Sequence, residues 1–212
     1  MADTIGAQPP GHGRKRRTNV RGEDARERIL DAAAREFEAH GVAGAQIQRI
    51  IDGAGATRGA VHYHFATKDS MARELIAQKH EIWPDIVVDV NSVGLTGIDA
   101  MKEMMRRAAL VLRDDVRARA AMRITPEVHG GTPGSSAYEV WHSFVRGFLG
   151  QGIADGTVRR DLDVREAAIV VVQAAIGVYI VARETGSMQS LEKQLERMWT
   201  YLLPGLIAHP PF

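Results

Sequence analysis

The sequence contains no cysteine, only 6% aromatic residues, and no excess of either sign of charge. Without cysteine there is no disulfide framework, thiolate nucleophile or cysteine metal site. Lysine and arginine number 27 and aspartate and glutamate 26, which excludes a chain that is basic throughout. The hydrophobic share of 45% and the charged share of 25% are ordinary for a globular protein and exclude wholesale disorder. A length of 212 residues fits one large domain, or a small domain joined to a medium one.

A long membrane-spanning run is also missing. The most apolar stretch, residues 167–182, contains Gln173 and is bounded by charged pairs, so it is too short for a comfortable span. The paired Arg16 and Arg17 are not followed by an apolar segment, which argues against an export signal. We therefore expect a soluble, cytoplasmic protein with no membrane partner.

The charges that are present are distributed unevenly. Residues 1–80 carry 13 basic and 10 acidic side chains, so the positive excess lies at the N-terminal end. Much of it comes from five residues, namely Arg14, Lys15, Arg16, Arg17 and Arg21. Residues 1–13 are rich in Gly, Pro and Ala and have no apolar periodicity. We predict a flexible basic arm over residues 1–21, which is either a solvated tail or, beside a DNA-binding unit, an arm on phosphates or the minor groove.

Apolar residues recur at helical spacing along nearly the whole chain, and no stretch shows convincing strand alternation. We predict an all-α fold of eight or nine helices, with a loop at residues 130–136. The expected helices are 24–40, 46–53, 57–63, 69–90 with an interruption at Pro84, 97–114, 116–124, 136–155, 164–184 and 188–207. Gly41 and Gly186 suit helix C-termini, and Asp163 suits an N-cap.

The segments 46–53 and 57–63 flank a short turn that contains Gly55, which is the layout of a helix-turn-helix. The isoleucines of the first segment are spaced for burial and would brace the second segment against the core. The second segment would then present Thr57, Arg58 and Gly59 to the major groove: the first two can donate hydrogen bonds, and glycine permits close approach. Spacing alone leaves DNA binding and ordinary helix packing equally open.

The residues themselves favour DNA binding. The run Gly55-Ala56-Thr57-Arg58-Gly59-Ala60-Val61-His62-Tyr63-His64-Phe65-Ala66-Thr67-Lys68-Asp69 resembles the DNA-binding signature of TetR-family repressors. The pattern Ile29 to Phe37, followed by Gly41, resembles the first helix of that family. The resemblance covers about 45 residues and implies three parts: an arm at 1–21, a three-helix DNA-binding domain at 22–68 and a larger helical ligand-binding and dimerisation domain at 69–212.

The resemblance implies DNA contacts from specific positions, of which Thr57, Arg58, Gly59 and Tyr63 would reach bases or backbone. The resemblance adds Gln46, Gln48, His62 and Lys68, with Lys68 on a phosphate, and the basic arm adds Arg14, Arg17 and Arg21 on its charge alone. This chain departs from the family pattern at two places. Ala45-Gln46 lacks the usual hydroxyl cap, and His62 replaces the usual phosphate-contacting tyrosine.

A second, looser resemblance is to the γ-butyrolactone-receptor branch, which includes furan-sensing repressors of antibiotic clusters. It rests on the run from His64 to Asp69, the following helix up to Trp83-Pro84, and the Tyr138-X-X-Trp141 pattern. It implies that Trp141 lines a ligand pocket, with Tyr138, His80 and Thr125 as its polar residues. Trp83 is a further pocket candidate. Gln173 is a candidate on its own chemistry, because an amide in an apolar helix needs a partner.

Other interpretations of these residues stay open. Trp83 and Trp141 are equally well suited to a core, Tyr138 to a helix end in water, and Gln173 to a dimer interface. The His62–His64 pair does not predict a metal site, because side chains two residues apart do not share a helix face. We therefore predict no metal and no cofactor.

The functional prediction is a homodimeric repressor that binds a pseudo-palindromic operator and is released by a small apolar effector. A γ-butyrolactone, furan or butenolide is the predicted effector class, and residues 167–182 with the last helix are the predicted dimer surface. The alternatives are a regulator of efflux or catabolism with another effector, and a pseudo-receptor without lactone response. No nucleophile–histidine–acid motif or phosphate-binding glycine loop predicts an enzyme.

Overall fold

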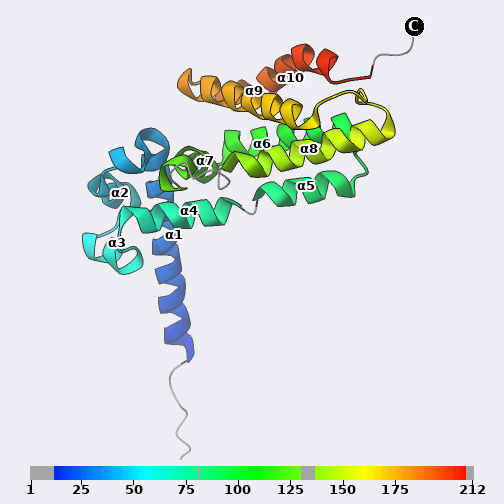
Figure 1. Ribbon diagram of the computed structural model, residues 1–212. Coiled ribbons are helices and arrows are strands. Elements are labelled where there is room, and N and C mark those ends of the chain that lie inside the picture. Colours follow the sequence, from blue (N-terminus) through cyan, green and yellow to red (C-terminus); the bar gives the residue numbers. More distant parts are fainter. Residues whose placement is uncertain (1–11, 81, 130–136, 209–212) are drawn as a thin grey trace, which may run out of the picture.

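Helical periodicity decides the architecture, and the predicted all-α fold class is confirmed. The computed structural model describes residues 12–80, 82–129 and 137–208, and this part of the chain forms ten α-helices, two short 3₁₀ helices and no strand (Figure 1). The N-terminal helices are α1 (His12–Gly44), α2 (Ile47–Ala54), α3 (Arg58–His64) and α4 (Lys68–His80). They are followed by α5 (Ile82–Ser92), α6 (Gly97–Asp114), α7 (Val116–His129), α8 (Ala137–Asp155), α9 (Val164–Glu184) and α10 (Leu191–Leu202). The predicted loop at 130–136 lies outside the described residues.

Local signals placed several helix ends correctly. Helices α6 and α9 have the predicted bounds. Asp163 caps α9, since its Oδ1 accepts hydrogen bonds from the backbone N–H of Arg165 at 3.0 Å and of Glu166 at 3.1 Å. Gly41 interrupts α1 with φ 67°, a left-handed conformation that glycine adopts without the strain a side chain would add.

Helix α1 begins earlier than the sequence suggested. It starts at His12, so the segment predicted as a flexible tail through residue 21 is helical over its second half. Arginine and lysine are good helix formers, and Pro10 is the last proline before the helix begins, which accounts for the difference. The first turns of α1 extend beyond the other helices (Figure 1). The side chains of Arg14, Arg17 and Arg21 lie outside what the structure describes.

Prolines account for two further differences. The helix predicted over 69–90 is divided into α4 and α5, and Pro84 lies in the first turn of α5. A proline there lacks only an N–H that has no partner inside the helix, whereas in a continuous helix its ring would clash with the carbonyl of His80. Helix α7 continues to His129 through Pro126, past its predicted end at 124.

The buried residues of the N-terminal part form one cluster. Phe37, Ile50, Val61 and Leu75 are its members from α1 to α4, and Ile124 comes from α7. Helices α4 and α7 lie beyond the predicted boundary at 68/69, yet both complete this core. Helix α7 therefore packs with the N-terminal helices and also contacts α6 of the C-terminal part.

The C-terminal part has its own apolar core between α6, α8, α9 and α10, in which Met101, Met104, Leu149 and Trp199 are almost fully buried. Helix α9 is long and apolar enough to cross a membrane, by length and composition alone. In this fold it packs against α8 and α10 (Figure 1).

Candidate DNA-binding surface and effector cavity

Helices α2 and α3 form the predicted helix-turn-helix. Ile50 and Ile51 anchor α2 in the core, and Val61 does the same for α3. Gly55 ends α2 with φ 58° and ψ 37°, and its backbone N–H bonds to the last carbonyls of that helix. Gly55 turns the chain so that the face of α3 opposite the buried Val61 points outward.

Thr57 fixes the start of α3. Its Oγ1 accepts a hydrogen bond from the backbone N–H of Ala60 at 3.2 Å, which is the predicted N-cap. The cap uses an oxygen lone pair only, so the hydroxyl hydrogen of this residue is left to donate outward.

A hydrogen-bonded chain of polar side chains links α3 to α2. Arg58 Nη2 donates to Gln48 Oε1 at 3.1 Å, and Gln48 Nε2 donates to Asp52 Oδ1 at 2.9 Å. All three residues are exposed. The chain holds two predicted DNA-contacting side chains side by side, which lowers the entropy they would lose on binding.

The remaining predicted residues of α3 also face outward. A Cβ added at Gly59 would meet no atom within 4 Å, so nothing inside the protein requires glycine there. Tyr63 is 86% exposed, and its ring lies edge-on to His64 with 5.1 Å between centroids. His62 is exposed. The open space at Gly59 would let a DNA backbone approach α3 closely, and the exposed Tyr63 beside it could contact that DNA.

Glu36 replaces the missing hydroxyl cap of α2. The side chain of Gln46 makes no cap bond, and its backbone N–H instead donates to Glu36 Oε1 at 3.0 Å. Arg49 Nη1 lies 3.6 Å from the same oxygen, which compensates the charge of this buried carboxylate. A carboxylate at a helix N-terminus is favourable. The sequence offered no local signal for this role, because the two residues lie on different helices.

Lys68 makes its hydrogen bonds within the protein. Its Nζ donates to the backbone oxygens of Val42 at 2.9 Å, Ala43 at 3.5 Å and Ala45 at 2.7 Å. The three donors of the ammonium group are thereby engaged within the protein. In the protein without DNA, Lys68 clamps the start of α4 to the chain around the end of α1, and its phosphate contact stays a prediction.

Helix α7 holds the DNA-binding helices from behind. Arg117 donates to Glu27 Oε2 at 2.7 Å and to Asp31 Oδ1 at 2.6 Å, both on α1. Burial opposes the charge of Arg117, but these carboxylates outweigh it and raise the pKa of its guanidinium. Arg119 forms an ion pair with Glu38, also on α1.

Further contacts of α7 reach the C-terminal end of α1. Arg123 Nη1 donates to the backbone oxygen of Glu38 at 2.7 Å. Glu127 Oε2 accepts from the backbone N–H of Val42 at 2.8 Å. A displacement of α7 is therefore passed to α1 through several directed contacts.

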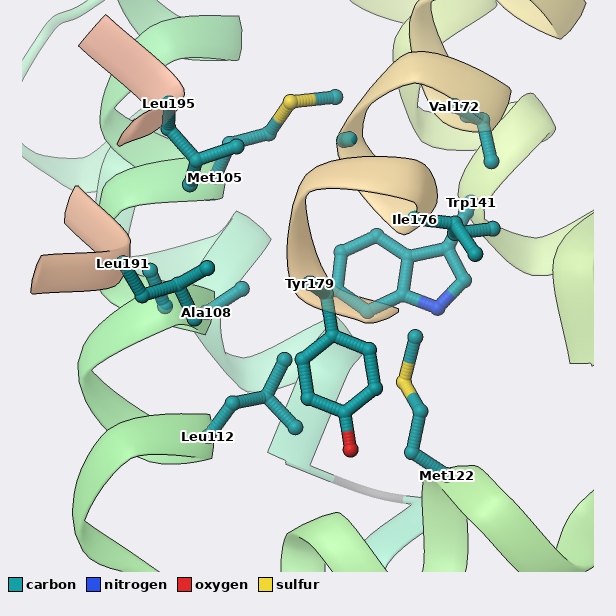
Figure 2. A pocket seen from close by; sticks show the side chains of 12 residues that line it. Met105, Ala108, Leu112, Met122, Trp141, Val172, Ile176, Tyr179, Leu191 and Leu195 are labelled. Atoms are coloured by element: carbon teal, nitrogen blue, oxygen red, sulfur yellow. The ribbon is translucent and has the colours of Figure 1, made fainter. Parts of the chain in front are cut away.

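An apolar cavity lies between α6, α7, α8, α9 and α10 (Figure 2). We call it the effector cavity. Its cavity volume is about 50 Å³, which is room for a few water molecules, so a larger ligand requires the walls to move apart. Figure 2 shows the Tyr179 ring between Leu112 and Met122, with the Trp141 indole beside Ile176. The lining comprises Met105, Ala108, Ala109, Leu112, Met122, Trp141, Val172, Ala175, Ile176, Tyr179, Leu191 and Leu195.

The predicted pocket residues are divided by the structure. Trp141 lines the effector cavity, and Trp83 packs behind it with 4.9 Å between ring centroids. Tyr138 lines an adjoining hollow. Thr125 does not line the effector cavity, and its hydroxyl donates to the backbone oxygen of Ala121 at 2.6 Å.

Two predicted pocket residues need separate mention. Gln173 is exposed and does not line the effector cavity, so a partner for its amide in a ligand or across a dimer interface stays a prediction. Val172, the preceding residue, faces the cavity. Because successive residues of an α-helix are rotated by about 100°, the side chain of Gln173 points away from it. The side chain of His80 lies outside what the structure describes.

Sequence reasoning missed Tyr179, the polar residue of the cavity lining. It is 5% exposed, and its hydroxyl is the one buried side-chain polar atom in the described part of the chain without a hydrogen bond. Burial raises the pKa of the Tyr179 phenol above its usual value, although the nearby Arg183 lowers it. The available signal was a tyrosine in the apolar stripe of residues 167–182.

Some known proteins are similar to part of this chain only, and others are similar over most of it. Residues 29–75 match the family described as bacterial regulatory proteins, tetR family. The A-factor receptor protein of Streptomyces griseus is 28% identical over 183 residues, which cover 86% of this chain and 63% of that protein. The regulator SrpR of Pseudomonas putida is 38% identical over 76 residues, which cover 35% of this chain and 36% of that protein. The chain thus spans less than two thirds of these relatives.

Solved structures extend the likeness to both parts. A structure solved for the molecular basis of control of antibiotic production by bacterial hormones has 26% identity and a TM-score of 0.70, covering 86% of this chain and 97% of that one. CprB from Streptomyces coelicolor, in complex with its operator, shares the fold with a TM-score of 0.76 at 24% identity, covering 89% and 90%.

The part of the chain that includes the helix-turn-helix is thus similar to the tetR family of bacterial regulatory proteins. Over most of its length the chain is similar to the A-factor receptor protein of Streptomyces griseus. The predicted family resemblance, including its γ-butyrolactone-receptor branch, is thereby confirmed. These relatives are regulators and a receptor, which agrees with the expectation that the chain is not an enzyme.

Proposed function

We propose that the protein is a homodimeric transcriptional repressor that acts in the cytoplasm on double-stranded operator DNA. The observation that carries this proposal is the outward face of α3. There Arg58 is held in place by Gln48, Gly59 has open space around it, and Tyr63 is 86% exposed. Such a face offers hydrogen-bond donors and leaves room for the DNA backbone to approach closely, as is required of a helix that enters the major groove.

A second copy of the chain completes the site. Val170 and Val181 on α9 and Tyr201 on α10 are 51%, 55% and 81% exposed, so these helices leave an apolar surface uncovered. Covering it with the same surface of a partner places two α3 helices on one assembly. Half-sites about one helical turn of DNA apart then form a pseudo-palindrome.

The effector acts through α7. Met122 of α7 lines the effector cavity, while Arg117 and Arg119 of the same helix hold α1. A molecule that requires α7 to shift would favour a conformation in which the two α3 helices no longer fit successive grooves. A differential affinity worth about 1–3 kcal/mol is the usual scale for such coupling.

The lining of the cavity restricts the effector to a small, mainly apolar molecule, and a γ-butyrolactone, furan or butenolide is the proposed class. Met105 and Met122 supply flexible walls that can reshape around it. Thermal-shift screening of these compounds identifies the class, since a ligand of the folded state raises the melting temperature. Stabilisation by other compounds alone would indicate a regulator of efflux or catabolism, and stabilisation by none a pseudo-receptor.

Fluorescence anisotropy with DNA from the protein's own upstream region tests repression. We expect sequence-preferring binding whose affinity falls as salt rises, because phosphate contacts release counterions. Light scattering on the free and bound protein reports the dimer. Binding that is equal for unrelated DNA at every salt concentration would refute the proposal.

A further inference from the structure

The effector cavity does not end at the Tyr179 ring. A second hollow shares three lining residues with it, namely Met122, Ile176 and Tyr179. On its far side this hollow is lined by Arg123, Tyr138 and Arg183, and we call these three residues the basic mouth. The shared residues make the two hollows neighbouring compartments, one apolar and one carrying two guanidinium groups.

The basic mouth carries an excess of positive charge. Arg183 pairs with Glu184, whose side chain is 64% exposed, and exposed pairs of this kind contribute little. Arg123 bonds to the backbone oxygen of Glu38 and forms no ion pair with a carboxylate among the described residues. The carboxylates that act on this region are Glu184, which is largely exposed, and Glu38, which is paired with Arg119. An anion in the hollow would meet two guanidinium groups.

Tyr179 stands at the junction of the two compartments. Its hydroxyl is buried without a hydrogen bond in the described part of the chain, which is an unfavourable state for a donor. Burial keeps the phenol protonated by raising its pKa, so the group can donate at neutral pH. A ligand atom that accepts this hydrogen bond would relieve the cost.

We propose that the effector is an amphipathic anion. Its apolar body fills the effector cavity, and its carboxylate accepts the Tyr179 hydrogen bond and pairs with Arg123 and Arg183. This inference rests on the proposed function, because it narrows the class of the effector to molecules with an acidic head. A neutral lactone can accept from Tyr179 but leaves both guanidinium groups without an anion.

Isothermal titration of the full-length, DNA-free protein at about pH 7.5 tests the head group with matched probes, because a carboxylate is fully ionised there. Octanoate and octanamide have the same apolar chain and nearly the same shape, and γ-octalactone supplies the neutral ring. We expect octanoate to bind at least about tenfold more tightly than either, since hydrogen bonds to charged groups are the stronger ones. Equal binding of the three probes, or no binding of octanoate at millimolar concentration, overturns the inference.

Two substitutions locate the anion. Tyr179→Phe removes the unpaired hydroxyl, so we expect an unchanged or higher melting temperature together with about tenfold weaker octanoate binding. Arg183→Gln should weaken octanoate but leave octanamide unaffected. Arg165→Gln, an exposed arginine at the other end of α9, is the matched control and should change neither. If octanoate binds as tightly to the first two variants as to the wild type, the basic mouth is not its site.

The readouts separate the inference from the proposed function. Titration reports the anion without any DNA. Arginine-dependent octanoate binding by a protein that does not bind its upstream DNA would refute repression and leave the anion site standing. Specific DNA binding by a protein that does not prefer octanoate would refute this inference alone.

Discussion

The proposed DNA-binding surface and the proposed effector cavity differ in the physical means by which they would recognise a partner. Around α3 the recognition groups are exposed, polar and held in place by hydrogen bonds, as in the Arg58–Gln48–Asp52 chain. The cavity is enclosed and apolar, with methionines in its wall and one unpaired hydroxyl. Hydrogen-bond donors that are held in place suit the regular arrangement of phosphates and base edges in DNA. A cavity wall with flexible methionines suits a ligand whose binding must displace a helix.

The glycines of the two regions make the same contrast. A Cβ at Gly59 would meet nothing within 4 Å, whereas one at Gly152, behind the C-terminal core, would lie 2.4 Å from Val158 Cγ2. The first glycine leaves room for something outside the protein, and the second leaves room for the protein's own packing. Substitution at the two positions should therefore affect different measurements.

The largest expected effect is at Gly59. Gly59→Leu should lower operator affinity about 100-fold, because the side chain occupies the space needed by the DNA backbone, a loss of about 2.8 kcal/mol. Its melting temperature should stay the same or rise, since leucine favours helix over glycine. Gly147→Leu on α8 is the control, because it too has open space around it. Equal operator affinities for the two variants would remove α3 from the interface.

Lys68 tests whether the clamp belongs to folding or to recognition. Lys68→Met leaves three carbonyls around the end of α1 without their donor, so we expect the free energy of unfolding to fall by about 2 kcal/mol in denaturant titrations. The dependence of DNA affinity on salt should keep its slope. A slope reduced by about one, with stability unchanged, would instead support the phosphate contact.

Gly152 should affect folding alone. Gly152→Ala forces its Cβ against the buried Val158, and overpacking of this kind costs about 1–3 kcal/mol. Chemical denaturation measures the loss, and anisotropy on the folded variant should give the wild-type operator affinity. Wild-type stability would mean that Val158 moves aside without cost.

The smallest expected effect is electrostatic and lies in the acid range. A hydrogen bond from Arg106, opposed by burial and assisted by Arg107, lowers the pKa of Glu103 from 4.5 to about 2. Its contribution to stability is therefore complete above pH 4.5 and is lost as the pH falls toward 2. Glu103→Gln should flatten the plot of unfolding free energy against pH in that window. An unchanged plot would show that the ion pair has no net effect.

Much of the fold could be predicted because its signals are local. Thr57 caps α3 and Asp163 caps α9 through backbone groups three residues away or fewer. Gly41 interrupts α1 and Gly55 ends α2, both with positive φ. Where a helix boundary was wrong, as at Pro84, the proline was recognised but its place in the first turn of a new helix was not.

The site residues were predictable only where they belong to one short segment. The exposed residues of α3 could be predicted from the helix-turn-helix motif, because the motif indicates which face of the second helix packs against the core. Tyr179 and the two arginines of the basic mouth had no such signal, since they meet only when α7, α8 and α9 pack together. The exposure of Gln173 could not be predicted for the same reason: periodicity identifies a helix but not which neighbours cover each face.

The sequence by itself determined most of the helices, the helix-turn-helix and the resemblance to a known family, because caps, turns and periodicity act over a few residues. Only the tertiary structure decided that Glu36 caps α2, that Lys68 clamps the end of α1 26 residues earlier, and that α7 holds both α1 and a cavity wall. Hydrogen bonds and cavities depend on distances between atoms far apart in the chain. Those distances are set by the packing of whole helices, which no local pattern records.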